Sequence, residues 1–125
     1  MLDVDTHDAP SFKPPGIALT EAQARTVRAI IDSVLPDAEV WVFGSRATGH
    51  ARPFSDLDLL LTQPRSLSWL QRADLRDAFE ASDLPFKVDV VEAEGLSGVT
   101  KERVNAERVL LRASQGSKPP RPATA

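Results

Sequence analysis

The chain has 125 residues, 42% of them hydrophobic, and 15 lysines and arginines against 18 aspartates and glutamates give it a net charge of −3. This length predicts one hydrophobic core and leaves no room for a separate substrate-binding domain. The lack of cysteine excludes disulfides, iron–sulfur clusters and cysteine nucleophiles, and two histidines are too few for a histidine metal cage. The acidic balance disfavours general nucleic-acid binding, and any metal is expected to be a hard cation held by carboxylates.

The two ends of the chain differ in composition from its middle. Residues 1–15 combine aspartates and prolines with few apolar side chains, and residues 114–125 are rich in proline. We therefore expect a disordered arm and a disordered tail around a domain at 16–113. The first ten residues carry three aspartates where a signal peptide has a basic stretch, and the longest apolar run has four residues. These features predict a cytoplasmic protein with no membrane span.

Between the two ends the pattern alternates helix and strand. Thr20 and Gln23 form a capping-box pattern, so a helix is expected to begin there and to end before Pro36. Periodicity then predicts strands at 39–43, 56–61 and 86–91, and helices at about 45–49, 66–81 and 99–107. Residues 109–111 are either the last turn of the final helix or an extended segment.

The Gly44-Ser45 pair, directly after the first expected strand, has the composition of a phosphate-binding turn. Glycine lets the backbone approach a phosphate closely, and the N–H groups that begin the next helix, with the Ser45 hydroxyl, can donate to its oxygens. Arg46 and Arg52 could add charge-assisted bonds. An ordinary β-turn explains Gly44 alone equally well, so the interpretation depends on the residues that follow.

Asp56 and Asp58 are two residues apart on an expected strand, so their side chains point the same way. Two like charges held so close are costly unless a divalent cation bridges them. Mg²⁺ commonly binds one or two carboxylates together with substrate phosphates, so the pair predicts Mg²⁺ carrying a nucleotide. The alternative is an acidic cap at a strand edge. Asp3 and Asp5 repeat the spacing without a glycine turn or hydrophobic strand, and are expected to be a solvated acidic tail.

A third carboxylate is expected if the chemistry uses two metal ions. Asp89 is the best candidate, because it lies between two valines in the middle of an expected strand, where an unpaired charge is costly to bury. The alternative is an ion pair with Lys87 or an arginine at a sheet edge. Glu92 and Glu94 follow the expected strand and are predicted to be solvated.

Taken together, the motifs GSRATG at 44–49, SDLDL at 55–59 and VDVV at 88–91 resemble those of a known family. They are similar to the minimal nucleotidyltransferases (MNT proteins) of the DNA polymerase beta-like nucleotidyltransferase superfamily, over roughly residues 19–111. The resemblance implies an α/β (α+β) fold with a small mixed sheet flanked by helices. It also implies roles for individual residues: metal ligands at Asp56, Asp58 and Asp89, with Asp89 also acting as base, and a triphosphate cradle at Gly44 and Ser45 supported by Arg46.

One position departs from the family pattern. Thr48 stands where many relatives have a second arginine in a GSRARG-like run. The chain therefore has one fewer fixed cation for the phosphates, which bears on the tightness of nucleotide binding and not on the chemistry.

The resemblance implies Mg²⁺-dependent nucleotidyl transfer from ATP, with two metal ions. Many short relatives are antitoxins that adenylylate (AMPylate) a tyrosine of a HEPN-type RNase toxin, which implies a toxin partner and a hetero-oligomer. This chain has no tyrosine, so an acceptor tyrosine must come from the partner. One alternative is a small-molecule, antibiotic-type nucleotidyltransferase, although those enzymes generally add a helical domain or second subunit. Another is a non-catalytic antitoxin that acts by binding. Neither a membrane nor direct nucleic-acid binding is expected.

Overall fold

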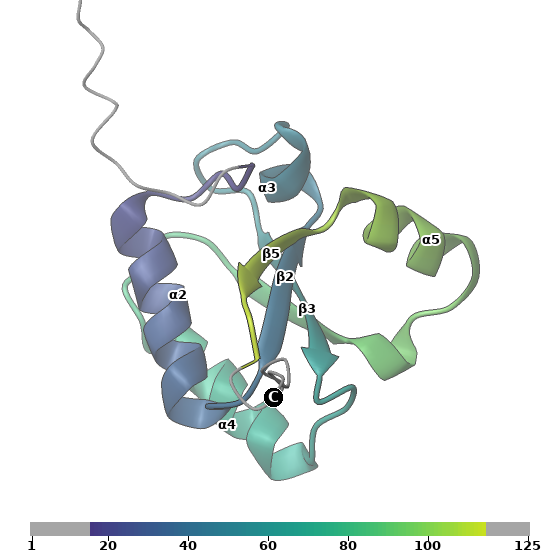
Figure 1. Ribbon diagram of the computed structural model, residues 1–125. Coiled ribbons are helices and arrows are strands. Elements are labelled where there is room, and N and C mark those ends of the chain that lie inside the picture. Colours follow the sequence, from purple (N-terminus) through teal and green to yellow (C-terminus); the bar gives the residue numbers. More distant parts are fainter. Residues whose placement is uncertain (1–15, 115–125) are drawn as a thin grey trace, which may run out of the picture.

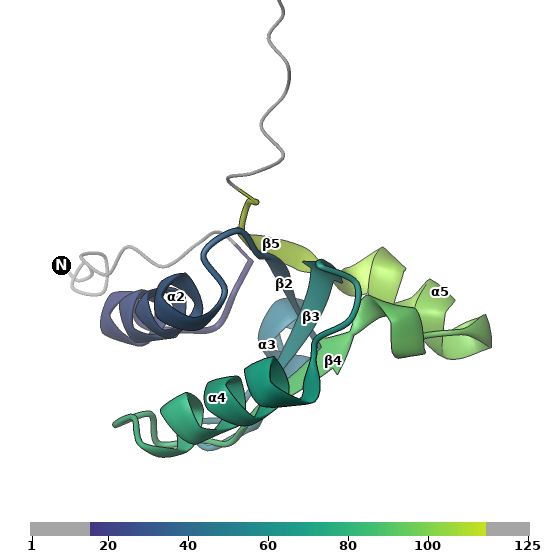
Figure 2. The same cartoon turned by 90° about the horizontal axis from the view of Figure 1, so that it is seen from below.

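The computed structural model describes residues 16–114, in which a four-stranded sheet carries helices on both faces (Figures 1 and 2). The helices are α2 (Glu21–Val34), α3 (Ser45–Thr48), α4 (Trp69–Glu80), the short 3₁₀ helix η1 (Ala93–Gly95) and α5 (Gly98–Glu107). The strands are β2 (Glu39–Phe43), β3 (Leu57–Gln63), β4 (Val88–Glu92) and β5 (Val109–Arg112). None of the helices in this part of the chain is long and apolar enough to cross a membrane.

The sheet is mixed, with the strand order β4-β3-β2-β5. Strand β2 is antiparallel to both β3 and β5, whereas β3 and β4 are parallel and are joined through α4. A parallel pair needs such a crossover, because a hairpin turn reverses the direction of the chain. The mixed α/β architecture agrees with the expected fold class.

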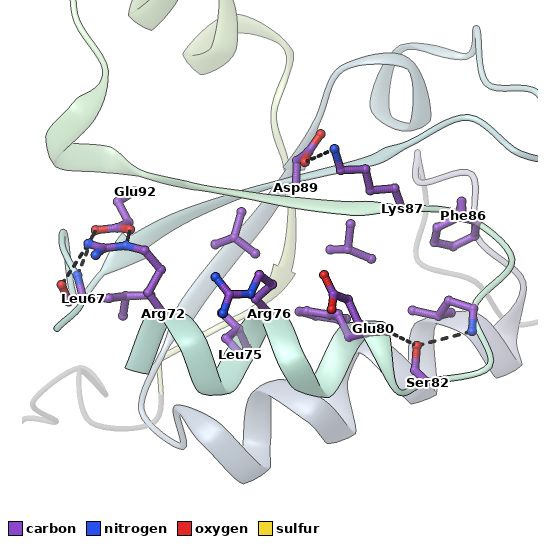
Figure 3. A pocket seen from close by; sticks show the side chains of 14 residues that line it. Leu67, Arg72, Leu75, Arg76, Glu80, Ser82, Phe86, Lys87, Asp89 and Glu92 are labelled. Carbon is purple, nitrogen blue, oxygen red and sulfur yellow. Dashed lines mark hydrogen bonds and ion pairs between the residues drawn. The ribbon is translucent and has the colours of Figure 1, made fainter. Parts of the chain in front are cut away.

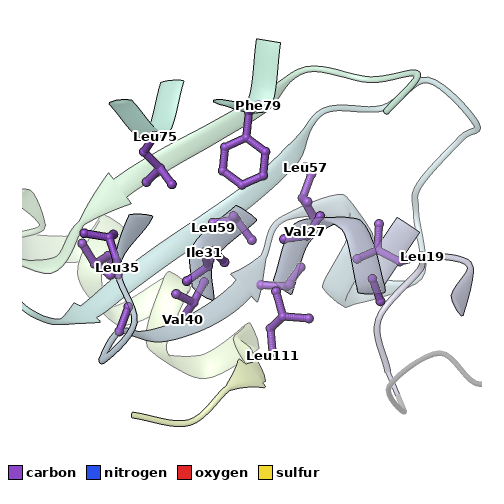
Figure 4. Packing of buried hydrophobic residues seen from close by; sticks show 14 of the residues in the cluster. Leu19, Val27, Ile31, Leu35, Val40, Leu57, Leu59, Leu75, Phe79 and Leu111 are labelled. Atoms are coloured by element: carbon purple, nitrogen blue, oxygen red, sulfur yellow. The ribbon is translucent and has the colours of Figure 1, made fainter. Parts of the chain in front are cut away.

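One face of the sheet packs against α2 and α4 and forms the main core (Figures 2 and 4). Leu57, Leu59 and Leu61 of β3 point into this core and are almost completely buried. A smaller cluster lies on the other face, on the side of α5 (Figure 2); it contains Phe43, Leu60, Ala93 and Val104. Because strand residues alternate between faces, Asp58 and Asp89 lie on the α5 face together with Leu60 and Val91.

Most element predictions are confirmed to within a few residues. The Thr20 and Gln23 capping box is present at the start of α2, and β2 spans the predicted residues. Helix α4 begins later than predicted, because Ser68 caps it by accepting a hydrogen bond from the Gln71 N–H. Residues 109–111 are extended and belong to β5, which pairs with β2.

The predicted arm at 1–15 and nearly all of the predicted tail at 114–125 lie outside the described residues. Ser114, the first residue assigned to that tail, belongs to the folded part of the chain. It is buried, and its hydroxyl donates to the Asp37 carbonyl oxygen at 2.7 Å.

Candidate active site

Gly44 makes the turn between β2 and α3 in a backbone conformation that requires glycine. Its φ of 76° lies in the left-handed region, where a side chain is strained. A Cβ built at this position would overlap Oδ2 of Asp58 and would lie 3.3 Å from its Cγ. The turn therefore lies directly against the first acidic residue of β3, which an ordinary β-turn does not require.

Two backbone N–H groups at the start of α3 are available to a ligand. The N–H groups of Ser45 and Arg46 make no hydrogen bond among the described residues, as expected for the first turn of a helix. The next two N–H groups, of Ala47 and Thr48, donate to the Gly44 carbonyl oxygen at 3.0 and 3.1 Å. The Gly44-Ser45 segment thus combines a close backbone approach with unpaired donors next to Asp58.

Asp58 and Asp89 occupy adjacent positions on the parallel strands β3 and β4, where they are partners in the ladder. Both side chains are half-buried, whereas Asp56, at the entrance to β3, is exposed. Burial raises the pKa of Asp58, and the negative charges of Asp89, Asp56 and Glu107 raise it further; Arg103 opposes this. Asp56 and Asp89, the other two acids predicted from the sequence, are therefore near enough to Asp58 to raise its pKa.

Asp89 also forms the ion pair that was the alternative interpretation. The Nζ atom of Lys87 lies 3.7 Å from Oδ1 of Asp89, with exposed fractions of 72% for the lysine and 43% for the aspartate side chain. Figure 3 shows both side chains on the side of β4 that faces away from α4. An ion pair this exposed contributes little stability and is readily exchanged for another cation.

The carboxylates suit a metal ion that arrives with its substrate. Within residues 16–114, no three aspartate, glutamate or histidine side chains are grouped closely enough to hold a metal ion between them. Mg²⁺ does not need such a cage, because it binds one or two carboxylates and completes its shell with phosphate oxygens and water. A cation would also relieve the repulsion that raises the pKa of Asp58. The donor set therefore fits Mg²⁺ bound together with a nucleotide.

Arg46, which the resemblance implies as a support of the phosphate cradle, makes its contacts within the fold. Its side chain is buried, and the guanidinium donates to the carbonyl oxygens of Ala18 at 2.7 Å and Ser55 at 2.9 Å, among others. The same group stacks on the ring of Phe86 at 4.1 Å. Burial lowers the pKa of Arg46, although a guanidinium keeps its charge in proteins. Arg46 thus supports the loop before β3, which carries Asp56.

Glu92 is not solvated as predicted. It is the last residue of β4, and its carboxylate accepts hydrogen bonds from Arg72 at 2.7 Å and from the Leu67 N–H at 3.0 Å. The Arg72 guanidinium lowers the pKa of Glu92. The pair closes one end of a pocket of about 690 Å³ between α4 and β4 (Figure 3). The walls of this pocket include Lys87 and Asp89 of β4 but neither Gly44 nor Asp58, so the pocket adjoins the site described above at Asp89.

Sequence reasoning missed two residues of α5. Oε2 of Glu107 accepts a hydrogen bond from the Gly44 N–H at 2.7 Å and another from Nη1 of Arg103 at 3.2 Å. The signal lies in strand pairing: β5 runs antiparallel to β2, with Val109 opposite Val42, so Glu107 comes opposite Gly44. A sequence that leaves 109–111 undecided between helix and strand does not reveal this contact.

Comparison with known proteins places the site in a family context. A model of the nucleotidyltransferase domain matches residues 24–111. A 66-residue stretch is 44% identical to MntA of Haemophilus influenzae, named as a probable protein adenylyltransferase. This stretch is 53% of the present chain and 58% of that protein, so the chain spans little more than half the length of this relative.

Two solved structures are also similar. One, assigned as a minimal nucleotidyltransferase, is 33% identical with a TM-score of 0.56, and the match covers 71% of this chain and 92% of that one. The other is the crystal structure of a toxin–antitoxin with AMP-PNP, with a TM-score of 0.58 and coverage of 74% and 75%. At 23% identity, the second likeness shows the fold alone.

Proposed function

The chain belongs to the nucleotidyltransferase domain family, and from this premise we propose that it transfers AMP from ATP to a hydroxyl group of a partner protein. The observation that carries the proposal is the placement of Asp58 beside Asp89 and against the Gly44 turn, so that acidic side chains and unpaired N–H donors meet. A site of this kind suits a polyphosphate that arrives with a hard cation.

In the proposed reaction the acceptor oxygen attacks the α-phosphorus of ATP. A new bond forms between that oxygen and phosphorus, while the bond from phosphorus to the bridging oxygen of the β-phosphate breaks and releases pyrophosphate. The acceptor proton passes to Asp89 on β4, the edge strand of the sheet, whose partly exposed carboxylate lies beside Asp58 of β3. The N–H groups of Ser45 and Arg46 hold the phosphates of the leaving group.

Asp58 and Asp89, with the exposed Asp56 at the entrance to β3, would hold the Mg²⁺ ions. When bound, Mg²⁺ neutralises the charge that develops on the attacking and leaving oxygens. Lys87 balances Asp89 in the free protein, and its exposed side chain can move away when the cation binds.

We infer further that the chain is the antitoxin of a toxin–antitoxin pair and that its acceptor is a tyrosine of a HEPN-type RNase toxin. The similarity to MntA, named as a probable protein adenylyltransferase, supports a protein acceptor. The fold shared with a toxin–antitoxin structure that holds AMP-PNP supports a toxin partner and ATP as donor. A hetero-oligomer also suits a chain without a tyrosine of its own.

The test is to co-purify the partner with the full chain, incubate the complex with ATP and MgCl₂, and weigh both proteins by intact-mass spectrometry. We expect the partner to gain the mass of one or more AMP units, on a tyrosine identified by peptide sequencing. Asp56→Ala and Asp58→Ala should abolish the gain, and so should chelation of Mg²⁺.

The other outcomes separate the alternative functions. A partner that is inhibited but never modified would contradict enzymatic transfer and indicate an antitoxin that acts by binding. Pyrophosphate release that requires an added small-molecule acceptor would indicate an enzyme of the antibiotic-modifying kind. Full transfer by the Asp58→Ala variant would show that the metal site is assigned to the wrong residues.

A further inference from the structure

Glu107 joins the end of α5 to the glycine turn of the site. Its Oε2 atom lies 2.7 Å from the Gly44 backbone nitrogen and 3.2 Å from Nη1 of Arg103, and only 16% of its side chain is exposed. The negative charge of Glu107 raises the pKa of Asp58, and the positive charge of Arg103 lowers it. The Glu107 carboxylate therefore lies within the active site and not on the outer surface of α5.

This contact continues the pairing of β2 and β5 beyond the last backbone bridge. Val42 pairs with Val109, and an antiparallel ladder continued by two residues would place the backbone groups of Gly44 and Glu107 opposite each other. The chain is already helical at Glu107, so its side chain takes the place of the missing ladder acceptor. A partly buried N–H without an acceptor would otherwise destabilise the turn.

The contact also decides which N–H groups remain for a phosphate. The Gly44 N–H is occupied by Glu107, whereas the N–H groups of Ser45 and Arg46 are not hydrogen-bonded among the described residues. Fixing the Gly44 N–H fixes the orientation of the peptide plane before Gly44, the point from which the segment with the next two N–H groups continues.

We propose that Glu107 is a positioning residue: by accepting the Gly44 N–H, it holds the phosphate-binding turn in the conformation that binds nucleotide. The inference rests on the proposed function, because it assigns the nucleotide to that turn. The positioning role requires a hydrogen-bond acceptor at position 107. It does not require the negative charge of the glutamate, which Arg103 already offsets. Glutamine, whose Oε1 can accept the same bond, should therefore replace glutamate, and alanine should not.

The experiment compares Glu107→Ala and Glu107→Gln with Glu102→Ala, an exposed glutamate on the same helix that serves as a matched control. In the ¹⁵N-labelled full chain, hydrogen exchange of the Gly44 amide reports the contact directly. Titration with ATP and MgCl₂ reports nucleotide affinity, and AMP transfer to the co-purified partner reports kcat and KM.

We expect Glu107→Ala to expose the Gly44 amide to exchange and to lower kcat/KM for ATP by about tenfold or more, because small misplacements of binding groups have such effects. Glu107→Gln should keep both properties within about threefold of the wild type, and Glu102→Ala should change neither. Wild-type kcat/KM and affinity in Glu107→Ala would overturn the inference. So would a Glu107→Gln variant as impaired as Glu107→Ala, because the charge would then be what matters.

The same measurements distinguish this inference from the proposed function. A wild-type chain that binds ATP with Mg²⁺ and transfers no AMP contradicts the proposed function; the inference then stands if Glu107→Ala weakens ATP binding by about tenfold, and falls if it does not. A wild-type chain that does not bind ATP contradicts both.

Discussion

The Asp58 carboxylate packs against the backbone of Gly44, in the space that a side chain at position 44 would fill; any Cβ there would overlap Oδ2 of Asp58. The turn after β2 and the first acid within β3 are thereby packed against each other, 14 residues apart in sequence. Two sequence motifs that look separate, the glycine turn and the paired aspartates, are thus one structural unit.

The first prediction concerns that contact. Gly44→Ala should abolish nucleotide transfer, because it adds both a strained backbone conformation and a clash with Asp58. Gly49→Ala is the control: its φ of 86° is also positive, but with a ψ of 12° it is in the milder left-handed helical region, whereas Gly44 has a ψ of −153°, and nothing lies within 4 Å of the added Cβ. Both variants should lose about 1–2 kcal/mol of unfolding free energy from backbone strain, with a larger loss for Gly44→Ala. Denaturant unfolding and AMP transfer measure the two effects, and transfer at the wild-type rate by Gly44→Ala would contradict the contact.

The second prediction concerns Arg46. Removing its buried guanidinium in Arg46→Ala leaves several carbonyl oxygens without donors and removes the stacking on Phe86. We expect a loss of about 3 kcal/mol or more in denaturant unfolding. Arg52→Ala, on an exposed side chain of the same loop, should have little effect on stability. If Arg46→Ala instead kept its stability and only weakened ATP binding, Arg46 would be a phosphate ligand after all.

The third prediction is a pH dependence at Glu92. Arg72 lowers the pKa of Glu92 below its ordinary value of 4.5, so the folded state prefers the charged form. The resulting stability is present above pH 4.5 and is lost as the pH falls through the lowered pKa. Thermal melts should show Glu92→Gln several degrees less stable than the wild type at pH 7, with the difference shrinking below pH 4.5. A difference that stays constant with pH would show that the charge has no role.

The fourth prediction is a trade between stability and function at Asp58. Burial and neighbouring acids raise its pKa above the ordinary value of 3.8, so the charged form disfavours folding at neutral pH. Without Mg²⁺, Asp58→Asn should therefore raise the Tm at pH 7 by a few degrees, and the gain should shrink as the pH falls toward 3.8. Added MgCl₂ with ATP should stabilise the wild type and not the variant. A lower Tm for Asp58→Asn at pH 7 would contradict the electrostatic strain.

Much of the architecture follows from local pattern. The alternating leucines of β3 and the capping residue of α2 are local signals, and both elements appear where they are predicted. Strand β4 begins at Val88, two residues later than predicted, because Phe86 has strand propensity but packs against the Arg46 guanidinium. Side chains chosen for a tertiary contact override propensity at such positions.

The site divides in the same way. The spacing of Asp56 and Asp58 and the position of Asp89 within a strand are readable from sequence, and β3 and β4 place Asp58 and Asp89 side by side. The roles of Arg46 and Glu107 are not readable, because each depends on which carbonyl or N–H group the fold brings to it from a distant segment. For charged residues of this kind, the contact partner cannot be predicted from the local sequence alone.

The most direct test of the central claim, that the acids beside the Gly44 turn perform AMP transfer, is the single-turnover rate of AMP transfer from ATP to the partner. We compare Asp58→Asn and Asp89→Asn with Lys87→Met, which removes the ion-pair partner of Asp89 and leaves the acids in place. Both aspartate variants should lose about a thousandfold or more in rate, since charge stabilisation in the transition state is lost, while Lys87→Met stays within about threefold of the wild type. Transfer at the wild-type rate by Asp58→Asn or Asp89→Asn would contradict the claim.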